Sequence, residues 1–395
     1  MNTLRPGLAL DEPDSPTPPC ADEPRAVVAP AAEGNGLLRL PWLEARPVLI
    51  TGGAGFLGAN LANRLLEAGE TVLLFDNLSR REIAKNVAWL RRAHGDRVEL
   101  AIADVRDRGA VEDAVRRASI VFHFAAQVTM RSSLADPRSD FLVNAGGTIN
   151  VLEAARQCAH RPPVVYASSS EVYGALPDIV LRRAPGRYEP SDGSIRLTGV
   201  SEARALDFQG PHGCSKGAAD QYVLDYARTY GLDAVALRLS CVYGPHQFGT
   251  EDQGFVAHCL QRAIVGEPIP VHGSGMQVRD ALFVDDLVDA LLLVRREMRR
   301  VSGQAFNIGG GPGNTVSVLE LVEIIEGLLG QRPELRDAPP RPGDRRYYVS
   351  DFRRLAALTG WTPRVRVRDG VRRLHEWLGE QAPRTSSVNI VEASS

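Results

Sequence analysis

The segment VLITGGAGFLG, at residues 48–58, is the clearest indication of the fold of this chain. It places an apolar run before a glycine-rich turn and a second apolar pattern behind it, as in a strand, a turn and a helix. Gly52 permits the tight turn, Gly55 lets the backbone approach a pyrophosphate, and Gly58 lets the helix pack closely against the strand. The first turn of such a helix offers free N–H groups and a positive dipole to phosphate. The segment therefore predicts a dinucleotide-binding unit.

Asp76 supports this interpretation, because it ends the next apolar run, 21 residues after Gly55. A carboxylate at that place accepts hydrogen bonds from the ribose hydroxyls of adenosine and repels a 2′-phosphate. We therefore expect NAD as the cofactor. Arg80 and Arg81 follow closely, and NADP therefore remains an alternative cofactor, since arginine can accommodate the 2′-phosphate.

The apolar runs extend this unit into a parallel sheet. From Pro47 onward, short apolar runs alternate with segments whose apolar residues recur at helical spacing. The expected strands are 48–51, 71–76, 98–104, 120–125, 164–169 and 234–240, and the expected helices include 59–68, 141–158 and 216–230. This order predicts the α/β class, with a doubly wound parallel Rossmann sheet and a smaller C-terminal substrate-binding lobe.

Composition along the chain suggests four segments. Residues 1–46 contain eight prolines and read as a disordered Pro/Ala-rich arm, and residues 381–395 read as a disordered polar tail. Between them we expect the NAD-binding Rossmann domain at 47–241. A mainly substrate-binding lobe follows at 242–380, part of which, within 281–308, returns to the Rossmann domain. The binding cleft should lie where the two lobes meet.

The bulk composition argues against several classes of protein. A net charge of -2 and a pI near 6.5 indicate no basic block, so we expect no nucleic-acid partner and no anionic membrane surface. No stretch approaches the ~20 apolar residues that span a bilayer. The five cysteines are scattered without CxxC or Cys/His spacing, which predicts no metal site and a protein of the reducing cytoplasm.

Longer motifs resemble a known family. They are TGGAGFLG at 51–58, HFAAQVTMRSSLADP at 123–137, SSSEVYG at 168–174, GCSKGAADQY at 213–222 and RPGDRR at 341–346. Over about residues 47–378 the chain resembles the extended short-chain dehydrogenase/reductases, in particular the nucleotide-sugar epimerases and, among these, the CDP-paratose 2-epimerases. This resemblance implies a permanently held NAD that takes a hydride from a sugar carbon and returns it to the other face. Epimerisation of a CDP- or UDP-linked sugar is the reaction that we expect.

The resemblance also implies roles for individual residues. The expected cofactor contacts are Gly52, Gly55, Phe56, Leu57, Gly58, Asp76, Asn77, Ser79, Arg80, Asp104, Val105, Ala125, Ala126, Gln127 and Lys216. Gln127, Arg279 and Arg346 are expected at the substrate, where the arginine forks suit the nucleotide phosphates. Ser169 is expected to orient the reacting sugar oxygen, with Ser170 beside it. A homodimer or homotetramer is implied as well, paired through helices of the dinucleotide domain.

His212 departs from the family pattern. In the family, a tyrosine four residues before the lysine takes the proton as the hydride leaves, whereas here His212 stands four residues before Lys216. Both positions lie on one helical face. The lysine charge disfavours an imidazolium, which leaves a neutral imidazole able to accept a proton. Imidazole is shorter than phenol, however, and an error on the order of 1 Å in reacting geometry can cost about a hundredfold in rate.

Two alternatives to a histidine-driven epimerase stay open. Glu171 occupies the place where related dehydratases and decarboxylases carry a glutamate that moves protons, and a carboxylate beside NAD could abstract a proton alpha to a ketone. The chain would then be a lyase. The other alternative is a protein that binds a nucleotide sugar and has lost the chemistry, since fold does not fix function.

Overall fold

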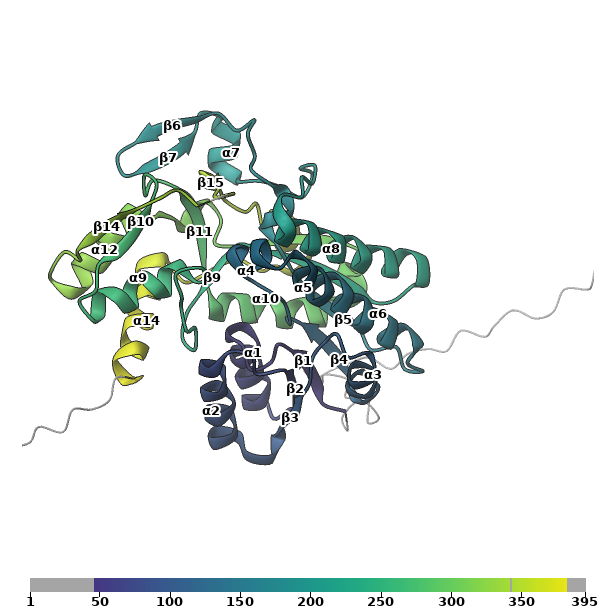
Figure 1. Cartoon of the computed structure of the whole chain (residues 1–395). Coiled ribbons are helices and arrows are strands. Elements are labelled where there is room, and N and C mark those ends of the chain that lie inside the picture. Colours follow the sequence, from purple (N-terminus) through teal and green to yellow (C-terminus); the bar gives the residue numbers. More distant parts are fainter. Residues whose placement is uncertain (1–45, 342, 382–395) are drawn as a thin grey trace, which may run out of the picture. The chain divides into compact units, whose positions relative to one another are not determined.

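Seven parallel strands form the central sheet of the structure, a computed structural model that describes residues 46–341 and 343–381. The strand order is β12-β8-β5-β4-β1-β2-β3. Figure 1 labels β5, β4, β1, β2 and β3 of this sheet. The bounds are β1 Val48–Thr51, β2 Val72–Asp76, β3 Val98–Ile102, β4 Ile120–His123, β5 Val164–Ser169, β8 Ala234–Leu239 and β12 Ala305–Ile308. The predicted α/β class and its doubly wound parallel sheet are confirmed. The arm and the tail expected at the two ends fall almost entirely outside the described residues.

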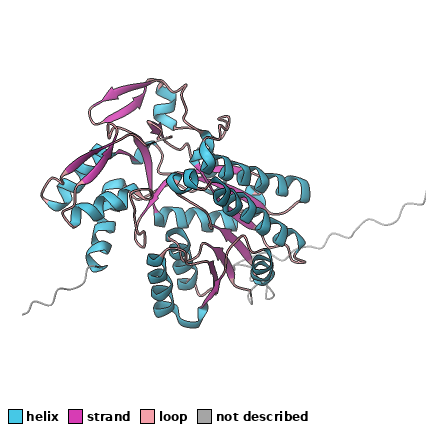
Figure 2. Ribbon diagram, in the orientation of Figure 1, coloured by secondary structure: helices cyan, strands magenta, loops and turns pink. Residues whose placement is uncertain are grey.

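Helices cover both faces of this sheet (Figure 2). One face carries α1 (Phe56–Glu67), α2 (Ala84–His94), α10 (Val284–Arg296), α11 (Met298–Val301) and α13 (Arg353–Thr359). The other face carries α3 (Arg108–Arg117), α6 (Gly147–Gln157) and α8 (Gly210–Tyr230). Strands that are covered on both faces are apolar along their whole length, which explains the uninterrupted runs in the sequence.

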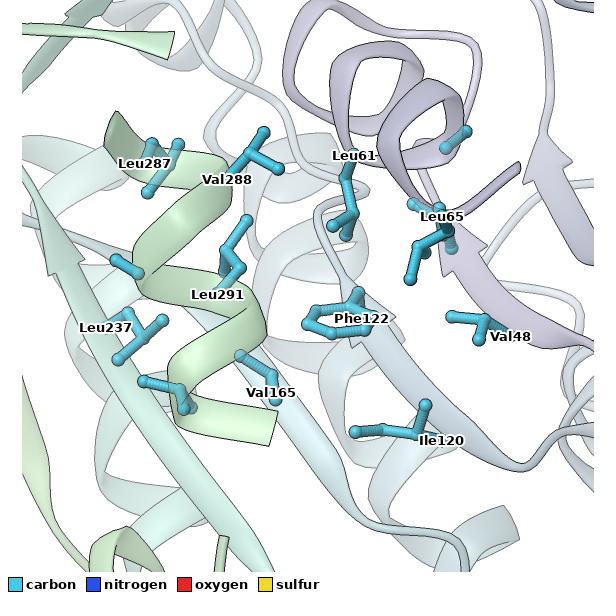
Figure 3. Close-up of a cluster of buried hydrophobic side chains, with 14 of the residues drawn as sticks. Val48, Leu61, Leu65, Ile120, Phe122, Val165, Leu237, Leu287, Val288 and Leu291 are labelled. Atoms are coloured by element: carbon cyan, nitrogen blue, oxygen red, sulfur yellow. The ribbon is translucent and has the colours of Figure 1, made fainter. Parts of the chain in front are cut away.

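Successive side chains of a strand enter different cores. Val48 and Ile50 of β1 belong to the core under α1 and α10, whereas Leu49 belongs to the core under α3 and α6. Figure 3 shows the first core, in which Leu61 and Leu65, one helical turn apart on α1, lie beside the sheet residues Phe122 and Val48. Full burial of such a leucine stabilises the fold by roughly 2 kcal/mol.

A second group of elements follows β8 and carries its own hydrophobic core. β11 (Val278–Phe283) pairs with β9 (Cys241–Tyr243), β13 (Thr315–Ser317) and β15 (Tyr347–Tyr348), and β10 (Ile269–His272) pairs with β14 (Leu335–Ala338). The helices of this group are α9 (Phe255–Ile264), α12 (Val318–Leu329) and α14 (Val367–Gln381). A hairpin of β6 (Leu181–Ala184) and β7 (Arg187–Pro190) precedes α7 (Gly193–Thr198).

The predicted helices differ from the observed ones in their bounds. The helix expected at 59–68 is α1, which begins three residues earlier, at Phe56. The helix expected at 141–158 consists of α5 (Pro137–Phe141), a π-helical turn (Leu142–Gly146) and α6, and α4 (Met130–Ala135) precedes them. The helix expected from 216 begins at Gly210, because Pro211 needs no N–H partner and suits the first turn. His212 therefore lies in the first turn of α8, at the end that faces the site.

The strand order also predicts where a ligand binds. The chain forms β1, β2 and β3 in one direction and then restarts with β4 on the other side of β1. Ligands of open α/β sheets bind at the carboxyl ends of the strands at such a switch point. Among the described residues, no helix combines the length and the apolar character needed to cross a membrane.

Candidate active site

Glycines shape the turn between β1 and α1. Gly52 has a φ of +68°, and a Cβ there would lie 2.8 Å from the backbone nitrogen of Ala125. A Cβ on Gly58 would lie 2.6 Å from the carbonyl oxygen of Gly52, so α1 can start this close to the turn only with glycine at that position. Gly55 is the N-cap and carries no side chain. The first N–H groups of α1 are thus placed to face a phosphate.

A cavity of about 790 Å³ opens at the carboxyl ends of β1, β2, β3 and β4. The residues expected at the cofactor line it, with the exception of Lys216: Gly52, Gly55, Phe56, Leu57, Gly58, Asp76, Asn77, Ser79, Arg80, Asp104, Val105, Ala125, Ala126 and Gln127. The structure thus brings together residues from four strand ends in a glycine-floored space that fits a dinucleotide.

The segment between β9 and α9 completes this cavity, through His246, Gln247, Phe248, Thr250 and Gln253. The Arg80 guanidinium donates a hydrogen bond to the Gln253 side chain, and the His246 ring stacks on Trp89 at 3.6 Å. None of these residues was predicted to contact the cofactor, because their approach depends on how the second group of elements packs against the sheet.

Asp76 holds the turn together from the end of β2. Its carboxylate accepts hydrogen bonds from the backbone N–H groups of Ala54 at 3.1 Å and Leu78 at 2.9 Å. Burial raises the pKa of Asp76 although both N–H groups oppose the shift. Asp104 lies across the cavity, where the side-chain hydrogen bond from Arg106 holds the pKa of its carboxyl far below its usual range.

His212 lies buried in the first turn of α8. Its Nδ1 is 3.8 Å from Oδ1 of Asp140, a fully buried carboxylate on α5. Asp140 was not among the predicted site residues. The only signal for it is the packing of α5 against α8, which is a tertiary contact.

Lys216 lies one turn further along α8 and is held at the end of β5. Its Nζ donates a 2.7 Å hydrogen bond to the carbonyl oxygen of Ala167, and burial lowers the pKa of Lys216 to about 8. Tyr166 also contacts this ammonium group, with 4.7 Å between Nζ and the ring centre. Tyr166 is not suited to accept a proton, because it is fully buried and burial raises the pKa of its phenol well above its usual value.

The residues after β5 form a short 3-10 turn, Ser170–Tyr173, against α8. Ser169 caps this turn, since its Oγ accepts a hydrogen bond from the Glu171 N–H at 3.1 Å. The Ser170 Oγ accepts a hydrogen bond from Arg345 at 3.1 Å. Glu171 forms an ion pair with the same arginine at 2.6 Å. Burial raises the pKa of Glu171, but the charges of Arg345 and Arg279 outweigh it and leave this pKa lowered.

The two predicted phosphate arginines lie in different surroundings. Arg279, on β11, donates to Asp344 at 2.7 Å and lies near enough to Glu171 to affect its pKa. The guanidinium of Arg346 stacks over Tyr188 at 5.7 Å. Arg345, which the sequence analysis did not select, is the one that contacts Ser170 and Glu171. Neighbouring residues of an extended segment point to opposite sides, and the sequence alone did not decide which arginine faces inward.

Gln127 lies at the junction of the cavity and the catalytic region. Its backbone N–H donates to the Asn144 side chain at 2.8 Å, and Asn144 in turn donates to Ser215 on α8 at 2.9 Å. His123, at the end of β4, has both ring nitrogens hydrogen-bonded, to Thr51 and Thr148, and burial lowers its pKa to about 3. In the described part of the chain, no group of three or more His, Cys, Asp or Glu residues could hold a metal ion.

The chain matches known proteins over most of its length. The model of the NAD dependent epimerase/dehydratase family matches residues 48–309. CDP-paratose 2-epimerase of Salmonella typhi is 38% identical over 337 residues, which cover 84% of this chain and 98% of that protein. UDP-glucose 4-epimerase of Mycolicibacterium smegmatis is 32% identical, over 83% of this chain and 97% of that protein.

Solved structures agree with these relatives. UDP-glucose 4-epimerase from Thermus thermophilus, in complex with NAD, superimposes with a TM-score of 0.71 and 31% identity, over 84% of this chain and 99% of that one. UDP-glucose 4-epimerase from Thermotoga maritima, with UDP-glucose, gives a TM-score of 0.72 and 28% identity, over 85% of this chain and 99% of that one. The resemblance drawn from the sequence motifs is confirmed.

Proposed function

The chain belongs to the NAD dependent epimerase/dehydratase family, and from that premise we propose that it inverts a hydroxyl-bearing carbon of a CDP- or UDP-linked sugar. NAD is its cofactor. Held at the turn of Gly52, Gly55 and Gly58, NAD would supply the acceptor and donor of the sugar hydride, so the protein must manage one hydroxyl proton and the orientation of the sugar. The full-length similarity to epimerases of a CDP-sugar and of UDP-glucose supports this substrate class.

His212 is the residue that we assign to the hydroxyl proton. The observation that carries this assignment is its place on α8, one turn before Lys216, whose Nζ is fixed to the end of β5. The imidazole takes the proton of the sugar hydroxyl as that carbon becomes a carbonyl, and returns it when the carbonyl is reduced. Lys216 supplies a cation next to the base, and its lowered pKa limits how strongly it competes for that proton near neutral pH.

Ser169 and Ser170 support the same chemistry from the end of β5. Ser169 is partly exposed, and its hydroxyl hydrogen is free to be donated because its Oγ accepts from the Glu171 N–H. We assign it to orienting the reacting sugar oxygen. Ser170 is buried and fixes Arg345 beside Glu171, so its role is to position this turn.

Glu171 supports the lyase alternative less well than its place in the motif suggested. A general base for a carbon-bound proton needs a raised pKa, whereas two arginines hold the pKa of this carboxylate down. Its ion pair with Arg345 also occupies one carboxylate oxygen. We therefore assign Glu171 to holding Arg345 and Arg279 in place, where they present positive charge to the substrate phosphates.

A homodimer is the assembly that we propose. Phe141, Leu142 and Tyr222 are large apolar side chains, each at least 43% exposed, on or next to the helices α5, α6 and α8. Of these helices, α6 and α8 cover one face of the dinucleotide-binding sheet, and α5 packs against α8. Exposed aromatic and aliphatic residues gathered on neighbouring helices are typical of a protein interface.

One experiment tests the function directly. The purified protein with NAD is incubated in heavy water with a panel of CDP-, UDP-, GDP- and dTDP-sugars, and the products are examined by NMR. We expect inversion at one carbon of a CDP- or UDP-sugar, without deuterium at any carbon, because the hydride returns within the site. If the product carries deuterium at carbon and has lost water or carbon dioxide, the protein is a lyase and the proposed epimerase activity is wrong. Binding without conversion of any sugar would leave a protein without this chemistry.

A further inference from the structure

His212 faces a buried carboxylate with its inner ring nitrogen. Nδ1 of His212 is buried, and among the described residues it has no hydrogen-bond partner. The nearby acceptor is Oδ1 of Asp140, at 3.8 Å, a distance that a small rotation of the ring would shorten to a hydrogen bond. A buried nitrogen aimed at a carboxylate is a costly arrangement unless it carries a hydrogen.

Three side chains hold Asp140 in place. Its Oδ1 accepts hydrogen bonds from Ser133 at 2.5 Å and from Asn144 at 3.2 Å, and its Oδ2 accepts one from Ser215. Burial raises the pKa of Asp140, but the contacts with His212, Ser133 and Ser215 outweigh burial and leave it lowered. Asp140 is therefore an ionised carboxylate in a fixed orientation.

The charge on Asp140 decides between the two neutral forms of the histidine. A bare Nδ1 would direct its lone pair at a carboxylate oxygen, which is repulsive, whereas an Nδ1–H directed at the same oxygen is attractive. In that second form Nε2 carries the free lone pair and is the proton acceptor. In the described part of the chain, Glu171, from the turn after β5, is close enough to interact electrostatically with His212, and Lys216 lies one turn along α8.

We propose that Asp140 is a positioning residue that holds His212 in the Nδ1–H form and so makes Nε2 the base. The proposal rests on the proposed role of His212 in epimerisation. When Nε2 takes the hydroxyl proton, the ring becomes an imidazolium whose charge Asp140 stabilises, and the proton leaves again when the sugar carbonyl is reduced. A tyrosine at position 212 has no nitrogen for Asp140 to act on, so this role depends on the histidine.

The first test reads the tautomer without any turnover. Full-length protein with NAD and 15N-labelled histidine is examined by long-range 1H–15N correlation NMR, and the His212 signals are assigned by their loss in His212→Gln. We expect Nδ1 to be protonated and Nε2 to be bare in the wild type, and this preference to be lost in Asp140→Asn. Ser133→Ala removes one hydrogen bond to the same carboxylate but keeps its charge, and should preserve the tautomer. A protonated Nε2 in the wild type would overturn the proposal.

The second test separates positioning from structural damage. Asp140→Asn is measured both in the wild type and in His212→Tyr, where Asp140 keeps its partners Ser133, Asn144 and Ser215. With His212, we expect kcat to fall by about 100-fold and the acid limb of the rate profile to move to lower pH by about 1 unit, with KM little changed. In the His212→Tyr background, where a phenol is the base, Asp140→Asn should lower kcat by less than about fivefold. Equal losses in both backgrounds would mean that Asp140 has a structural role only.

The two tests also separate this proposal from the proposed function. If the protein converts no sugar in the panel, but His212 is in the Nδ1–H form and loses it in Asp140→Asn, the proposed role of Asp140 stands and the proposed epimerase activity is wrong. If the protein epimerises a sugar of the panel while His212 is in the Nε2–H form, the proposed activity stands and the proposed role of Asp140 is wrong.

Discussion

Nζ of Lys216 donates a 2.7 Å hydrogen bond to the carbonyl oxygen of Ala167. This contact ties the first half of α8 to the carboxyl end of β5, the strand that leads into Ser169 and Glu171. Because His212 lies one turn earlier on the same helix, the bond also fixes how far the imidazole stands from the strand end.

Lys216 should give the stability of the protein a measurable pH dependence. Burial lowers its pKa from 10.5 to about 8, although Asp140 and Asp220 oppose the shift. Between these values the unfolded chain binds more protons than the folded one, so the contribution of Lys216 to the free energy of unfolding increases as pH rises. We expect the unfolding free energy of the wild type, relative to Lys216→Met, to increase by up to about 3 kcal/mol from pH 7.5 to 10.5 in urea titrations. If the difference in unfolding free energy between the two proteins does not change with pH, the ammonium group of Lys216 is exposed to solvent.

His212 should be replaceable by tyrosine but not by phenylalanine. Both rings fill the site, but only the phenol can exchange a proton beside Lys216. We expect His212→Phe to lower kcat by about 100-fold or more, and His212→Tyr to retain substantially more activity, in assays on the accepted nucleotide sugar. Wild-type turnover by His212→Phe would remove residue 212 from the mechanism.

Gly58→Ala should damage the cofactor turn. The added methyl group would meet the carbonyl oxygen of Gly52 at 2.6 Å and Cα of Gly53 at the same distance, both backbone atoms that cannot rotate away. We expect a loss of about 2 kcal/mol in unfolding free energy and a protein purified with little NAD. Gly327→Ala, on α12, is the matched control, because nothing lies within 4 Å of its new methyl group. That variant should be unchanged or more stable by up to about 1 kcal/mol.

The effects of substituting Arg345 and Glu171 on stability should not be additive. Arg345→Met removes the 2.6 Å ion pair and leaves the Glu171 carboxylate without its main partner, whereas Glu171→Gln keeps a hydrogen-bonding oxygen. We expect Arg345→Met to cost about 2 kcal/mol of stability, and Glu171→Gln to cost less and to keep kcat within about tenfold. Denaturation curves and turnover of the single and double variants measure the coupling. A collapse of turnover in Glu171→Gln, with the fold intact, would favour the glutamate route.

The helix face of α8 should control assembly. Tyr222→Glu places a charge on an apolar side chain that is 44% exposed. We expect the variant to be monomeric, or to form a dimer weakened by at least about tenfold, in light scattering after size-exclusion chromatography. Leu197→Glu, on α7 and 76% exposed, serves as the control and should leave the assembly unchanged. If Tyr222→Glu behaves like Leu197→Glu, the dimer uses another face.

The strands and the cofactor turn were predictable because their signals are local. An apolar run such as Val48–Thr51 identifies a strand that is covered on both faces, and the glycine spacing that follows it specifies a turn that only glycine can form. Helix bounds were less accurate. The helix expected from residue 216 begins at Gly210, since Pro211 is compatible with the first turn and ends no helix there.

Residues close together in the chain were enough to predict the parallel α/β sheet, the NAD-type turn at residues 52–58 and His212 as the residue four positions before Lys216. The partners that meet these residues depend on the tertiary structure. Packing of α5 on α8 places Asp140 beside His212, and the segment before β15 turns Arg345 rather than Arg346 toward Glu171. Such pairs depend on the packing of elements that are distant in the sequence. Their charges interact strongly because the surroundings are buried and of low dielectric constant, and the spacing of residues in the sequence does not show this.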